Sequence, residues 1–106
     1  MEGYILKKIM NDLGQFETVE FSGLLVLKNA ESIKNELFIV VKNLNNKVRI
    51  VISDVQDIDI SFIQLILAFI QFMDNNHIAY KFEWNLSDEL QTLLENVGFS
   101  NELFLN

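Results

Sequence analysis

Three carboxylates lie within one short segment, Asp54-Val55-Gln56-Asp57-Ile58-Asp59. Carboxylate oxygens are the ligands that Mg²⁺ prefers, so Asp54, Asp57 and Asp59 form a candidate cation site. The alternative is structural. Asp59 directly precedes a helical pattern, where an aspartate caps the helix and gains about 0.3–1 kcal/mol from its dipole. We favour capping, and we expect no bound metal and no cofactor.

Other residue types on which enzymes depend are scarce. The chain has one histidine, His77, and no cysteine. His77 lies in a predicted turn and has no second histidine or cysteine to complete a metal site, so we expect it to be solvated. The sequence contains no glycine-rich phosphate loop and no nucleophile motif. We therefore expect a protein that is not an enzyme.

The elements that position these residues follow from hydrophobic periodicity. Runs rich in β-branched and aromatic residues predict strands over residues 4–10, 15–22, 47–54 and 78–84. Apolar residues at helical spacing predict a helix after an N-cap at Asn29, a helix over 60–75, and a third helix after Asn85 or Ser87 that ends at Gly98. Residues 54–59 become the loop between a strand and the second helix.

Strands that alternate with helices predict the α/β class. We expect one domain over residues 1–106, with a mixed, mainly parallel β-sheet and helices packed on it. The order is β-β-α-β-α-β-α plus a short tail.

Charge and hydropathy exclude several functions. The chain has 106 residues, 8 of them basic and 15 acidic, and a net charge of -7. Nucleic acid is therefore not an expected partner, because binding it requires a basic surface. The longest uncharged stretch, residues 60–73, is too short to span a bilayer, and no signal peptide is recognisable. We expect a cytoplasmic protein that does not insert into membranes.

The acidity is unevenly distributed. Residues 1–50 hold 7 basic and 6 acidic side chains, a net charge of +1, whereas residues 51–106 hold 1 basic and 9 acidic side chains, a net charge of -8. A partner that docks on the second half should therefore present a basic surface.

The second predicted helix has an unusual surface. Projected at 100° per residue, its polar and small residues form a narrow solvent-facing stripe, made of Ser61, Gln64, Ala68, Gln71 and Asn75. Leu65 and Phe72 lie beside this stripe, so a helix lying on a sheet would leave them partly exposed. We interpret them as a docking patch. The alternative is that the first or third helix covers them.

Residues 52–65 resemble the signature of STAS domains, the module of sulfate transporters and anti-sigma factor antagonists. The matching residues in this segment are Ser53, Val55, Ile58 and Asp59, followed by Gln64 and Leu65. Two further stretches are similar to parts of the family, Phe21-Ser22-Gly23 and the closing stretch Leu90–Leu94 with Gly98, Phe99 and Phe104. The resemblance covers nearly the whole chain, in the expected order.

Three departures from the signature concern function. The family's phosphorylated Ser or Thr directly follows the loop aspartate, and this sequence has Ile60 there. Asp54 replaces a glycine, and Phe62 replaces the glycine that lets partners approach the helix start, so we expect an altered binding surface. Ser61 is the remaining hydroxyl in the segment, and we name it as an alternative phosphorylation site.

The resemblance implies a regulatory module that binds a kinase-like or anti-sigma partner through the 54–59 loop and the start of the second helix. Another implied role is a cytoplasmic subunit of a lipid-trafficking ABC transporter, whose partner is the transporter ATPase. The residues expected to bind the partner are Asp54, Asp57, Asp59, Ile60, Ser61, Gln64, Leu65, Ala68 and Phe72. A small-molecule ligand, or catalysis on one, would rest on the acidic segment alone and is not expected.

Overall fold

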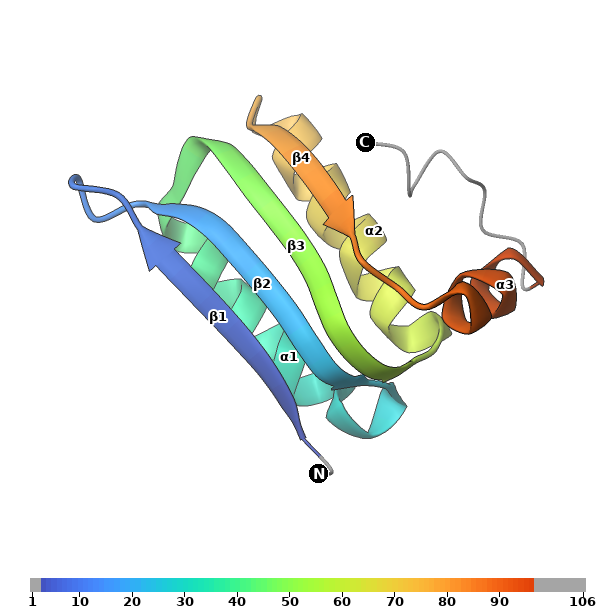
Figure 1. The fold of residues 1–106 in the computed structure, drawn as a ribbon. Coiled ribbons are helices and arrows are strands. Elements are labelled where there is room, and N and C mark those ends of the chain that lie inside the picture. Colours follow the sequence, from blue (N-terminus) through green and yellow to red (C-terminus); the bar gives the residue numbers. More distant parts are fainter. Residues whose placement is uncertain (1–2, 97–106) are drawn as a thin grey trace.

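A four-stranded sheet and the helices behind it form the two layers of this computed structural model, which describes residues 3–96 (Figure 1). In chain order the elements are β1 (Tyr4–Met10), β2 (Phe16–Leu25), α1 (Leu27–Val40), β3 (Leu44–Ile58), α2 (Ile60–Asn75), β4 (Ala79–Trp84) and α3 (Asp88–Asn96). A single 3₁₀ turn, η1 (Val41–Asn43), joins α1 to β3. The predicted helix end at Gly98 and the predicted tail lie outside the described residues.

The strands lie in the order β1-β2-β3-β4. β1 runs antiparallel to β2, whereas β2, β3 and β4 run parallel to one another. Each parallel connection is a right-handed crossover, and successive crossovers in one direction place α1 and α2 on the same face of the sheet. Figure 1 shows both helices behind the strands. The predicted class, the element order and the mixed, mainly parallel sheet are confirmed.

The core lies between the sheet and these two helices. Alternate strand residues point inward, among them Phe21, Ile50, Ile52 and Phe82, and meet Ile33 and Leu37 of α1 and Ile63 and Ile66 of α2. Phe62 also points inward, and its ring meets that of Phe21 edge to face with 5.2 Å between the centroids. Phe62 stands where the signature has a glycine, and its side chain fills the core. That it alters the binding surface stays a prediction.

Residues 54–58 belong to a strand and not to a loop, contrary to the sequence-based prediction, and Asp59 alone joins this strand to α2. β3 continues to Ile58, and its last part pairs with the end of β2 through Gly23↔Val55 and Leu25↔Ile58. The register shifts twice there, so β3 holds extra residues relative to β2, which is the definition of a bulge. Asp54 takes a left-handed φ of 50° at the first shift. Polar residues in a bulged strand resemble a loop in sequence, which explains the error.

The start of α1 was also predicted wrongly. The helix begins at Leu27, and its N-cap residue is Val26, whose side chain cannot accept a hydrogen bond. Asn29 is helical instead, and its amide donates to the carbonyl of Leu24 at 2.8 Å. The helix therefore starts without a local cap.

The other helices match the predictions more closely. α2 spans the predicted 60–75, and Ser87 caps α3 by accepting from the backbone N–H of Leu90 at 3.2 Å. Within residues 3–96, no helix is long and apolar enough to cross a membrane.

Candidate functional site

The carboxyl ends of β2 and β3 meet the first turns of α1 and α2 at one side chain, Asp59. Its Oδ1 accepts a hydrogen bond from the backbone N–H of Ser61 at 2.9 Å, and its Oδ2 accepts one from the backbone N–H of Leu27 at 2.8 Å. The Ser61 hydroxyl also donates to Oδ1. Asp59 in turn donates its own N–H to the Leu25 carbonyl at 3.2 Å. One carboxylate therefore satisfies the starts of both helices.

These contacts determine the direction in which the pKa of Asp59 is shifted. Partial burial alone would raise the pKa of this carboxyl, but hydrogen bonds from the Ser61 hydroxyl and from the backbone N–H groups of Leu27 and Ser61 lower it below its ordinary value. The predicted capping role is confirmed. Both oxygens are engaged, and no three metal-ligating side chains gather in a cluster within residues 3–96.

The other two carboxylates of the segment face solvent. Asp57 is exposed, and its carboxylate accepts a local bond from the N–H of Ile58 at 2.9 Å. Asp54 is exposed at the bulge with its positive φ. That backbone conformation favours glycine, which explains why a glycine suits this position in the signature and why an aspartate, which tolerates it, can replace glycine.

Two apolar side chains flank Asp59 at the same end of the sheet. Ile60, at the first position of α2, is 51% exposed, and Leu27, at the first position of α1, is 72% exposed. Sequence reasoning named Ile60 but missed Leu27, because it placed the helix start at Asn29. The sequence does show Leu27 as an apolar residue shortly after a predicted strand. This points to an exposed position only if the helix is known to begin there.

Ser61 lies in the first turn of α2 and is half-buried. Its hydroxyl hydrogen already has an acceptor in Asp59. A phosphoryl group at Oγ would remove this donor and place a dianion near the carboxylate that caps two helices.

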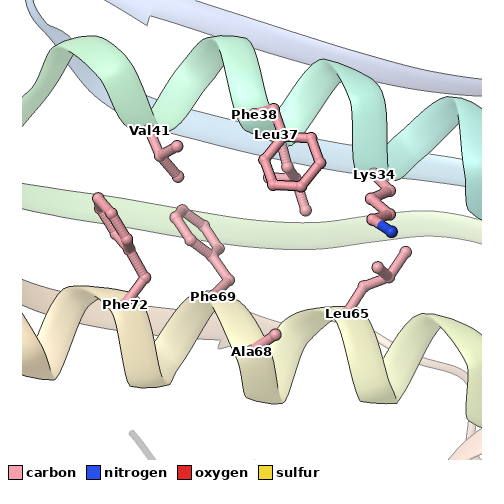
Figure 2. A pocket seen from close by; sticks show the side chains of 8 residues that line it. All are labelled: Lys34, Leu37, Phe38, Val41, Leu65, Ala68, Phe69 and Phe72. Atoms are coloured by element: carbon pink, nitrogen blue, oxygen red, sulfur yellow. The ribbon is translucent and has the colours of Figure 1, made fainter.

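The remaining residues of the predicted set lie farther along α2. Gln64 and Ala68 are exposed, whereas Leu65 and Phe72 are half-buried, because α1 covers them in part. Leu65, Ala68 and Phe72 line a groove between α1 and α2, about 160 Å³ in volume (Figure 2). The predicted set therefore divides between the end of the sheet and this groove.

A second hollow adjoins the end of the sheet. It has a volume of about 390 Å³ and lies between the last residues of β3 and α3. Asp57 and Glu89 line it together with apolar side chains that include Leu90 and Leu93. The end of the sheet thus combines acidic groups with accessible apolar surface.

Comparisons with known proteins agree with this arrangement. The family model described as STAS domain matches residues 7–106. A search of curated proteins finds no match. STAS domains generally bind other proteins and are generally not catalytic. Since the match extends over nearly all of the sequence and the element order agrees, this chain belongs to the STAS domain family.

Proposed function

We propose that this protein is a cytoplasmic, non-catalytic regulatory module that resembles an anti-sigma factor antagonist. It binds a kinase-like or anti-sigma partner through the end of β3 and the start of α2. The observation that carries the proposal is the exposed pair Ile60 and Leu27, held on either side of Asp59 at that end of the sheet.

The chemistry of this surface supports a protein partner. Burying Ile60 and Leu27 on a partner contributes roughly 1.5–3 kcal/mol each, which offsets part of the cost of association. Asp54 and Asp57 supply a polar, acidic rim around these apolar side chains. An apolar centre with a polar rim is the usual anatomy of a protein interface.

Ser61 is the proposed site of regulation. Its phosphorylation adds about -1.5 to -2 charges beside Asp59. The added charge is favoured by the dipole of α2 at its N-terminus and opposed by Asp59 and Asp57. We expect the modified module to bind its partner more weakly, because the dianion must be desolvated next to Ile60.

A second candidate function is a cytoplasmic subunit of a lipid-trafficking ABC transporter. Ile60 favours this role, because its side chain cannot be phosphorylated and stays available for a permanent apolar contact. In this case the partner is the transporter ATPase, and binding does not alternate with a phosphorylation state.

One capture experiment distinguishes the two roles. The tagged full-length chain is purified from its native cells, and the copurifying proteins are identified by mass spectrometry. A soluble histidine-kinase-like ATPase supports the regulatory module, whereas a transporter ATPase supports the subunit.

The binding site is then tested with the purified partner. Ile60→Glu should weaken binding by about tenfold or more, because it places a charge in the apolar centre of the interface. Ile9→Glu is the matched control, because Ile9 on β1 is 40% exposed and pairs with Thr18 near the start of β2, away from this end of the sheet. Equal binding by both variants would contradict the proposed site.

A further inference from the structure

The groove between α1 and α2 lies on the outer side of the helical layer. Leu37 and Phe38 form its α1 wall, and Leu65, Ala68 and Phe72 form its α2 wall. Figure 2 shows Lys34 and Leu65 at one end of the groove and Phe72 at the other. The groove belongs neither to the Asp59 site nor to the hollow beside α3.

Its size indicates what it can hold. A volume of about 160 Å³ is smaller than the roughly 300–1,000 Å³ of typical cofactor and ligand pockets. It suits a short row of apolar side chains that enter it in part rather than an enclosed small molecule. From Leu65 to Phe72 the α2 wall spans about 10 Å, or two helical turns. Side chains at i, i+4 and i+7 of a docked helix have the same spacing.

The surface beside the groove indicates a protein occupant. No charged residue occurs in α2 from Ile60 to Met73, although the chain has a net charge of -7. Gln64 and Gln71 belong to the exposed polar stripe of α2, and on the α1 wall of the groove the aromatic side chain of Phe38 is 56% exposed. The centres of protein interfaces are depleted of charge and rich in aromatic residues in the same way.

The charge of the groove defines the complementary group. Among the residues that the structure describes, Lys34 is the one charged residue that lines the groove, and its Nζ lies 5.7 Å from the centre of the Phe38 ring. A carboxylate on the occupant can reach this ammonium without losing apolar contacts deeper in the groove. A second copy of this chain packed through the same groove fits less well, because the described residues that line the groove include no carboxylate to pair with Lys34.

We propose that the α1–α2 groove is a second docking surface, which binds an amphipathic helix of another protein. Apolar side chains of that helix at i, i+4 and i+7 enter between Phe38 and Phe72, and an acidic residue pairs with Lys34. This surface is separate from the Ile60 end of the sheet, so it can be tested without the partner proposed for that end.

The test uses a defined probe. A fluorescein-labelled, lactam-stapled helical peptide of about four turns carries leucines at i, i+4 and i+7 and glutamates at both ends of this series. A companion peptide has lysines in place of the glutamates. Fluorescence anisotropy with the full-length protein should show saturable binding of the glutamate peptide and much weaker binding of the lysine peptide.

Variants then locate the contact. Phe38→Ala should weaken binding by about tenfold, whereas Leu67→Ala should change it by less than about twofold. Leu67 is the matched control, because it is 45% exposed on α2 but does not line the groove. Ala68→Glu should block peptide binding, because it places a charged side chain in the groove. It should leave α2 folded, because Ala68 is exposed. Lys34→Glu should weaken binding of the glutamate peptide by about fivefold and should strengthen binding of the lysine peptide.

Other outcomes would overturn the proposal. These are the absence of saturable binding up to about millimolar protein, or equal effects of Phe38→Ala and Leu67→Ala. Saturable binding of dodecanoate that competes with the peptide would assign the groove to a lipid chain instead. Dimers in light scattering that Phe38→Ala dissociates would assign it to a second copy. None of these results would affect the proposed role of Ile60.

Discussion

Each oxygen of the Asp59 carboxylate serves a different helix, and one of these helices begins 32 residues earlier in the sequence. Unpaired N–H groups at the start of a helix need acceptors, and the N-cap residue of α1, Val26, has no side chain that can supply one. Asp59 therefore acts both as a cap of α2 and as a tie between two crossover connections. Sequence reasoning predicted the first role from the aspartate before a helical pattern. It could not predict the second, because the Leu27 contact exists only after β2 and β3 have paired.

Replacing Asp59 by alanine should lower the free energy of unfolding by about 2 kcal/mol at pH 7, the upper range for loss of an N-cap. The pKa of Asp59 is lowered in the folded protein, so its contribution is fully present above the unfolded pKa of about 3.9. It is lost as the pH falls through the lower, folded pKa. Urea unfolding followed by circular dichroism from pH 7 to pH 3 should therefore show the difference between wild type and variant shrinking.

Asp57→Ala is the control for this experiment. Among residues 3–96 the exposed Asp57 carboxylate accepts a hydrogen bond from the adjacent Ile58 alone, so the variant should stay within about 0.5 kcal/mol of wild type. A stability difference for Asp59→Ala that does not change between pH 7 and pH 3 would contradict the assigned pKa direction.

At the scale of elements, the end of α2 is as well defined as its start. The N–H of His77 bonds to the carbonyl of Asp74 at 3.3 Å, and the N–H of Ile78 bonds to that of Met73 at 2.9 Å. His77 has a left-handed φ of 57°. This is a Schellman motif, in which glycine is the usual residue at the left-handed position. Histidine there costs conformational free energy.

Glycine in place of His77 should therefore stabilise the protein, by about 0.5–1 kcal/mol. For a domain of this size we expect the Tm in calorimetry to rise by roughly 2–8 °C. Asn76→Gly is the matched control with the opposite expected sign. Asn76 has a negative φ of -104°, and its side-chain amide donates to the Phe72 carbonyl at 2.8 Å. A Tm for His77→Gly at or below that of wild type would rule out strain at this position.

The comparison of prediction with structure also depends on the element. α2 was predicted from end to end, because a local cap and a local periodicity define it. The end of β3 was not, because Asp54 and Asp57 are polar and the bulge breaks the alternation of strand residues. The groove residues Leu65 and Phe72 were recognised as unusual, but the wall opposite them, formed by Phe38, depends on how α1 packs beside α2. Distances between elements of this kind are not encoded in the spacing of residues within one element.

At the scale of the whole molecule, charge is segregated. The end of the sheet and α3 carry exposed acidic residues, among them Asp54, Asp57, Asp88 and Glu89. On the sheet, by contrast, Arg49 and Glu83 form an ion pair whose Nη2 and Oε1 atoms lie 2.9 Å apart. The exposed acidic residues therefore give the proposed Ile60 surface a negative electrostatic field.

We expect this field to accelerate binding of a basic partner. The association rate constant of the partner that binds at Ile60 should fall by roughly tenfold between about 0.03 M and 0.3 M salt, measured by stopped-flow fluorescence. Asp57→Asn combined with Glu89→Gln should reduce this salt dependence. Asp12→Asn combined with Glu17→Gln removes the same charge near the β1–β2 turn and should leave it unchanged. An association rate that is insensitive to salt would contradict electrostatic steering at this surface.

The order of the strands in the sheet also has a consequence for how the chain is made. Because β1, β2, β3 and β4 neighbour one another in the order of synthesis, each strand that leaves the ribosome finds its pairing edge already present. The hydrogen bond between Asp59 and the Leu27 N–H can form only when β3 is complete, and it then fixes the start of α1 at the end of the sheet. The two proposed docking surfaces are therefore absent from the nascent chain until residues near 60–72 have emerged, so a partner cannot engage the protein before most of its sheet is built.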